Sequence, residues 1–132
     1  MSHHRAVSLL LVGCVFLVAC THSLLFRSAI VREVENARRR TLPSDGRLDG
    51  ITEPAKNEFG IRATWKVWTR LDSQAYVHWL KNQFPEYRVV SETDSKLILA
   101  KQVEADSYNL EVNVKTSSSG TAAEVTFSVR AD

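Results

Sequence analysis

The fold of this chain is decided by residues 108–130, YNLEVNVKTSSSGTAAEVTFSVR. Apolar residues alternate with polar ones on both sides of a Ser- and Gly-rich break. A period of two is typical of a strand that buries one face, and the break predicts a flexible turn. We therefore expect an antiparallel hairpin whose buried positions are Tyr108, Leu110, Val112, Val114, Ala123, Val125, Phe127 and Val129.

The pattern extends toward the N-terminus as far as Ile61. Residues 63–71 alternate as a strand, and apolar residues from Ala75 to Phe84 then follow at helical spacing. Asp72 or Ser73 offers the N-cap of this helix, and Pro85 stops it. Residues 87–91 and 96–103 predict two more strands. The expected core comprises Trp65, Tyr76, Trp79, Leu80, Phe84, Leu97, Leu99, Leu110, Val112, Val125 and Phe127.

This order predicts an α+β domain over residues 61–132. One helix packs on a four- to five-stranded antiparallel sheet, in the order β-α-β-β-β-β, because a sheet with one hydrophobic face must bury it. The order resembles the cystatin-like arrangement, in which a curved meander grips a helix. That family's Gln-x-Val-x-Gly loop is absent from residues 102–106, QVEAD. The resemblance therefore concerns the pattern of elements and implies no inhibitory function.

The first twenty residues have the composition of a leader. A polar head with Arg5 precedes an uncharged apolar run over residues 6–19, as in secretory signal peptides. The run ends in Leu17-Val18-Ala19-Cys20, which resembles the lipobox of bacterial lipoproteins. The resemblance implies that residues 1–19 are a signal peptide, cut between Ala19 and Cys20. It also implies that the Cys20 thiol is acylated and that the lipid holds the chain at a bilayer.

An uncleaved single span is the alternative, because 21 uncharged residues lie between Arg5 and Arg27 if His22 is neutral. A bilayer needs about 20. Polar residues at positions 21–23 weaken this alternative, and a buried helix of a soluble protein is a third. The lipobox implies a domain outside the cytoplasmic membrane, in the periplasm or beyond, anchored to the cell membrane or the outer membrane. Thr21 after the Cys resembles the outer-membrane sorting pattern of enteric-type bacteria.

Residues 20–60 predict a lipidated N-terminus, a helical stalk and a linker. Five apolar residues share one face of an amphipathic helix over residues 24–40: Phe26, Ala29, Ile30, Val34 and Ala37. This helix could pack on the domain, lie along the membrane or form a partly frayed stalk. Two prolines and three glycines in residues 41–60 are typical of a linker. A chain from Phe59 to Asp132 is therefore expected to fold alone.

Charge and residue types favour a role without catalysis. Loss of Arg5 with the leader lowers the formal charge from +2 to +1, which gives no reason to expect nucleic acid as a partner. With Cys20 modified, His22 and His78 belong to no cluster with metal-ligand spacing. His78 is expected on the exposed side of its helix. We therefore expect no metal, no cofactor and no catalytic residues.

Trp68 is the one residue that local pattern does not explain, since it interrupts the polar face of the strand over residues 63–71. An aromatic residue there suits contact with a partner or glycan. The alternative is a side chain covered by the helix of residues 24–40 or by the linker. A free sheet edge is a further surface that could recruit a partner strand.

The leading functional hypothesis is a non-enzymatic binding or accessory module of the cell envelope. Its partner would be an envelope protein or a cell-wall component. One alternative is an envelope enzyme, or an enzyme subunit, whose site the sequence pattern does not reveal. Another is a single-span membrane protein that acts as a structural part of a complex.

Overall fold

The computed structural model describes residues 29–51, 55–57 and 60–131 of the 132-residue chain. The predicted leader, including Ala19 and Cys20, lies outside these residues. Val34–Asp132 forms one compact unit, and Met1–Glu33 is a separate one. Among the described residues, no helix combines the length and the apolar character needed to cross a membrane.

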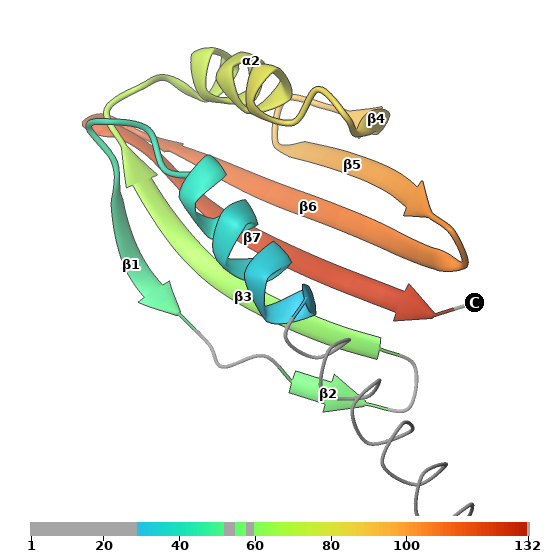
Figure 1. Ribbon diagram of the computed structural model, residues 1–132. Coiled ribbons are helices and arrows are strands. Elements are labelled where there is room, and N and C mark those ends of the chain that lie inside the picture. Colours follow the sequence, from blue (N-terminus) through green and yellow to red (C-terminus); the bar gives the residue numbers. More distant parts are fainter. Residues whose placement is uncertain (1–28, 52–54, 58–59, 132) are drawn as a thin grey trace, which may run out of the picture. The chain divides into compact units, whose positions relative to one another are not determined.

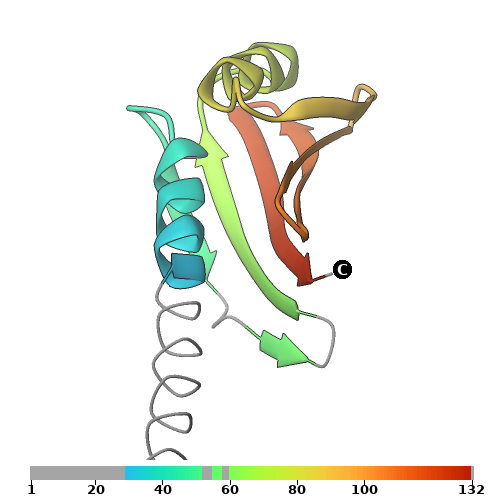
Figure 2. The same ribbon diagram turned by 45° about the vertical axis from the view of Figure 1, so that its right-hand side comes forward.

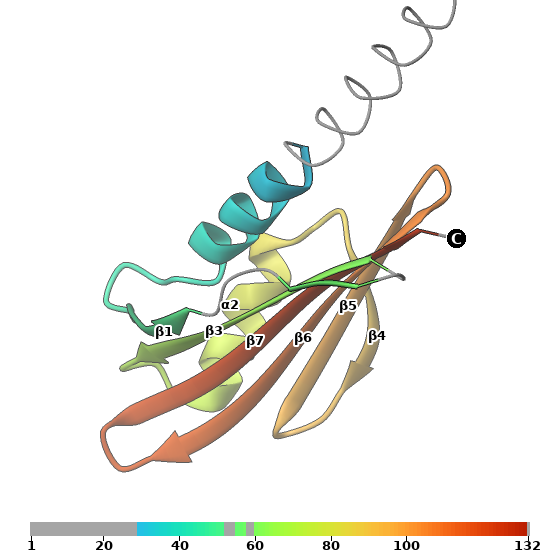
Figure 3. The same cartoon turned by 90° about the horizontal axis from the view of Figure 1, so that it is seen from below.

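Seven strands form one antiparallel sheet in the order β1-β3-β7-β6-β5-β4, and β2 also pairs with β3 (Figures 1 and 3). The sheet is accompanied by helix α2 (Ser73–Gln83) and by helical residues 29–40. The strands are β1 (Arg47–Ile51), β2 (Ala55–Asn57), β3 (Gly60–Thr69), β4 (Arg88–Glu92), β5 (Lys96–Val103), β6 (Asp106–Ser117) and β7 (Gly120–Ala131).

From β3 to β7 the elements follow the order that the sequence predicts. The Asp72 carboxylate accepts a hydrogen bond from the Ala75 N–H at 2.8 Å, so it is the N-cap of α2. The helix ends at Phe84, next to Pro85. In the β6–β7 hairpin Leu110 lies opposite Phe127, as the alternation requires.

The core lies on one face of the sheet and contains ten of the eleven residues expected there. The exception is Trp79, which is half-buried and stacks on Tyr76 with ring centroids 6.0 Å apart. Val34 and Ala37, from the helical segment before β1, are also buried. Figure 2 shows residues 34–40 running beside β1 and β3, while α2 crosses one end of the sheet.

The predicted fold class is wrong in the number of elements. The sheet has seven strands rather than four or five, and a second helix is present. The expected linker contains β1 and β2, which both pair with β3. The expected stalk continues into the compact unit from Val34 onward. A one-helix domain preceded by a stalk therefore does not describe this chain.

Pro43 and Gly46 form a tight turn, and Gly60 allows a close approach between strands. The Gly46 N–H donates to the Pro43 carbonyl at 2.9 Å and closes a turn that leads into β1. Asp45, in this turn, accepts from the Thr69 hydroxyl at 3.1 Å and from the Arg70 N–H at 2.9 Å. Gly60 has a φ of 153°, and a Cβ there would lie 1.9 Å from the Val129 carbonyl oxygen. The segment is thus fastened to β3 and β7.

Thr41 is fully buried and joins three elements. Its hydroxyl accepts from the Trp65 indole N–H at 2.8 Å and donates to the Arg38 carbonyl at 2.8 Å. Its own carbonyl accepts from the Tyr76 hydroxyl at 2.6 Å. Burial raises the pKa of Tyr76 far above its usual value, so this hydroxyl remains a donor. Thr41 therefore ties the N-terminal helix to β3 and α2.

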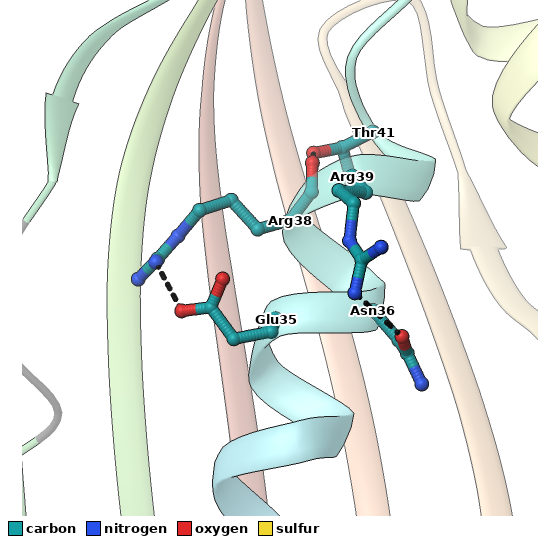
Figure 4. A network of polar contacts seen from close by, with 5 residues as sticks. All are labelled: Glu35, Asn36, Arg38, Arg39 and Thr41. Carbon is teal, nitrogen blue, oxygen red and sulfur yellow. Dashed lines mark hydrogen bonds and ion pairs between the residues drawn. The ribbon is translucent and has the colours of Figure 1, made fainter.

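The last turns of the N-terminal helix carry a polar network of their own (Figure 4). Arg38 forms an ion pair with Glu35 at 2.7 Å, and its guanidinium lies 5.6 Å from the centroid of the Trp65 ring. Arg39 donates to the Asn36 side chain at 3.4 Å. These arginines stand at a helix C-terminus, where positive charge is favourable.

Arg40 joins the same helix to the segment after α2. It donates to the Gln83 carbonyl at 2.9 Å and to the Glu86 carboxylate at 2.8 Å. Its guanidinium also lies 4.2 Å from the centroid of the Phe84 ring. The hydrogen bond from Arg40 lowers the pKa of Glu86 below its usual value. The carboxylate therefore stays ionised and paired at neutral pH.

Thr41→Val should lower the free energy of unfolding by about 1–3 kcal/mol, because the buried Trp65 N–H loses its acceptor while the side-chain volume is conserved. Thr126→Val, on the half-buried opposite face, is the control and should change it by no more than about 0.5 kcal/mol. Urea unfolding followed by circular dichroism measures both. Equal effects of the two variants would contradict the central role of Thr41.

A chain shortened to Phe59–Asp132 should fail to unfold cooperatively, against the expectation from sequence. It lacks β1, the β2 partner of β3, and the Thr41 hydrogen bonds to Trp65 and Tyr76. A chain from Thr21 to Asp132 is the control and should give a cooperative transition. Thermal melting of both chains decides the point, and a sharp transition in the shorter one would show that residues 34–57 are dispensable.

Candidate binding face

Trp68 lies on the sheet face opposite the core, because side chains alternate between the two faces along β3. Trp65 is 1% exposed on the buried side, whereas Trp68 is half-buried. The guanidinium of Arg47 lies 4.8 Å from the centroid of the Trp68 ring, and the two residues are register partners in β1 and β3. The partial cover of Trp68 thus comes from the segment expected as a linker. The N-terminal helix contacts the other face through Trp65.

We call the sheet face that carries Trp68 the outer face. Register partners place its residues on one side of the sheet, and each is half-buried or exposed. They are Arg47 from β1, Arg62, Thr64, Lys66 and Trp68 from β3, Ala122, Glu124, Thr126, Ser128 and Arg130 from β7, Ser107, Asn109, Glu111, Asn113 and Lys115 from β6, Lys96, Ile98, Ala100 and Gln102 from β5, and Arg88 and Ser91 from β4.

The outer face is predominantly basic. It carries seven Lys and Arg residues, against Glu111, Glu124 and Asp49, the last of which pairs with Arg47 at 2.9 Å. Lys96 pairs with Glu111 at 3.0 Å. The register places Trp68 in a row with Arg47 and Lys115, beside the row that contains Lys66. An aromatic side chain therefore lies among basic ones.

A shallow hollow of about 600 Å³ occupies the outer face between β4 and β7. Its lining is mainly small or uncharged and includes Ala100, Asn109 and Ser128, with Arg88 and Arg130 on the two flanking strands. Lys101 also lines the hollow, and three basic side chains around it suit an anionic group. The hollow was not predicted, because it combines residues from four strands.

The two edges of the sheet are poorly suited to adding a strand. β1 has a register shift between Leu48 and Gly50, and β4 has one between Val89 and Ser91. Such irregularities protect edges from pairing with another chain. Val89 and Val90 are about half exposed on β4, but the strand is only five residues long. The broad outer face is therefore a better candidate for binding than either edge.

A second, smaller hollow of about 320 Å³ lies between α2 and the β4–β5 turn. Its lining includes His78, Lys81, Glu92 and Asp94, and Lys81 pairs with Glu92 at 3.0 Å. His78 is exposed, as expected. Within the described ranges, no three or more His, Cys, Asp or Glu side chains are grouped to hold a metal ion. This hollow offers a polar surface and an ion pair.

Comparisons with known proteins give little further guidance. No protein-family description matches this chain, and no curated protein does. One solved structure that resembles it is that of LpqN, described as involved in cell envelope biogenesis of Mycobacterium tuberculosis. The two chains are 12% identical, the match covers 69% of each, and the TM-score is 0.36. A likeness of this extent carries no argument about function.

Trp68→Ala should cost about 1 kcal/mol of stability or less, because the side chain is half-buried on a solvent-facing surface. Trp65→Ala is the matched control and should cost about 3–5 kcal/mol, since it empties a buried site. Chemical unfolding of both variants gives the comparison. A loss at Trp68 as large as that at Trp65 would make Trp68 a structural residue and remove it from the binding face.

Proposed function

We propose that this protein is a lipid-anchored component of the cell envelope whose domain binds a partner through the outer face, without catalysis. The observation that carries the proposal is the sequence Leu17-Val18-Ala19-Cys20 at the end of an uncharged apolar run. It supplies a small residue before the cut and a thiol to accept the lipid. Cys14, the other cysteine, would leave with the leader.

Two features of the domain support binding rather than catalysis. Buried polar side chains such as Thr41, Thr69 and Thr121 are engaged in bonds that hold elements together. The exposed polar side chains are spread over a broad sheet face, with a shallow hollow in it. Such a surface suits a contact with a large partner, because many weak contacts can form across it at once.

A membrane anchor is consistent with a surface that binds its partner through weak contacts. A lipid tether confines the domain near the bilayer and gives it a high effective concentration toward anything there. Stable anchoring needs two or more acyl chains, at about 0.8 kcal/mol per buried methylene. The acylated Cys20, carrying a diacylglycerol, would meet that requirement.

Cys20→Ser should abolish incorporation of an alkyne palmitate analogue, because acylation needs the thiol at position 20. Cys14→Ser is the control and should be labelled as strongly as the unchanged protein. Gel fluorescence after coupling a dye measures labelling in whole cells. Equal labelling of the Cys20→Ser variant, or none of any chain, would contradict the lipid anchor and favour the single-span alternative.

A further inference from the structure

The charges of the chain are divided unequally between the outer face and the rest of the molecule. The outer face has seven basic residues and, with Asp49, three acidic ones, a net charge of +4. The chain from Cys20 onward has a formal charge of only +1, so everything outside this face sums to −3. The domain is therefore strongly polarised, although its overall charge is nearly neutral.

Once the ion pairs are set aside, the remaining basic residues of the outer face lie on β3, β7, β6 and β4. Lys96 and Arg47 are neutralised by Glu111 and Asp49. Of the five remaining basic residues, Arg62, Lys66 and Arg130 lie on the adjacent strands β3 and β7. Glu124 is the one acidic residue left among them, opposite Lys66.

The sequence also limits how far this face can lie from the lipid. Cys20 precedes Val34, the first residue of the compact unit, by 14 residues. Because residues 29–33 are helical, the stretch from Cys20 to Val34 spans at most about 40 Å. This length limits the distance between Val34 and the bilayer surface, and attraction of the face begins within roughly 8–10 Å of that surface at physiological salt.

We propose that the outer face docks on the anionic phospholipid surface of the bilayer that holds the lipid on Cys20. This inference rests on the proposed function and names the partner of its binding face. Basic residues near an anionic surface each strengthen binding roughly fivefold. Trp68 lies in a row with Arg47 and Lys115, and indole rings favour the polar–apolar boundary of a bilayer. The negative remainder of the domain is repelled by the same surface, which selects one orientation.

The test uses the lipidated protein, reconstituted on vesicles that contain a lipid with a nitroxide on its head group. The nitroxide quenches nearby tryptophan fluorescence. A Trp68→Phe variant gives the contribution of Trp65 and Trp79, so that the difference reports Trp68. We expect strong quenching of Trp68 on phosphatidylcholine vesicles that also contain phosphatidylglycerol, and little on phosphatidylcholine alone. About 1 M salt should abolish it, because the screening length falls to about 3 Å.

Two double variants with equal loss of charge separate the outer face from the N-terminal helix. Arg62→Gln with Lys66→Gln should reduce Trp68 quenching on anionic vesicles at least fivefold. Arg32→Gln with Arg39→Gln, both exposed on the helix, should leave it unchanged. Loss of quenching in the helix variant alone would overturn the inference, because the helix would then be the surface that meets the membrane.

The remaining outcomes are equally decisive. Equal quenching on neutral and anionic vesicles, or none on either, overturns the docking. A photo-crosslinker at Thr126 in living cells should give lipid adducts, and a discrete protein or polymer adduct instead would assign the face to another partner. Mass spectrometry of the same preparation reports the lipid on Cys20. A lipidated chain that does not dock overturns this inference alone, whereas an unlipidated chain overturns the proposed function on which it rests.

Discussion

The architecture depends on the buried polar contacts of Thr41. Three elements that are separate in sequence meet at this residue, and each brings a polar group that has left water. Trp65 contributes its indole N–H, Tyr76 its hydroxyl, and the N-terminal helix the carbonyl of Arg38. An unsatisfied buried polar group is costly, so the three groups favour this one arrangement. Apolar burial holds the helices on the sheet, and Thr41 specifies where they lie.

The sequence predicts the helix and strands that have a clear local pattern of apolar and polar residues. From Gly60 to Ala131, alternation and a helix with clear start and stop signals give the observed elements. The segment before Gly60 differs from the prediction because proline and glycine are common both in linkers and in tight turns between strands. Pro43 and Gly46 form a tight turn, although the same residues are common in linkers. The register shift in β1 interrupts its alternation, which hides a strand of only five residues.

The sequence predicts those features of the candidate site that depend on the alternation of residues within one strand. The alternation of side chains along β3 predicts that Trp65 and Trp68 lie on different faces of the sheet, and the structure places them so. The basic character of the outer face depends instead on cross-strand register. Arg62 and Arg130 lie in adjacent rows of β3 and β7, although they are 68 positions apart in the chain. The net charge of the chain does not show that charge is distributed unequally between the two faces, because it adds the charges of both.

The two faces of the sheet are under different constraints, and this bears on how a binding surface could evolve here. On the inner face, nearly every side chain is packed or hydrogen-bonded, so changes there alter stability first. On the outer face, half-buried and exposed residues can change charge or size at little cost to folding. The irregular edges restrict association through added strands. The outer face is thus a broad surface of the domain whose chemistry can be set by a partner rather than by the fold.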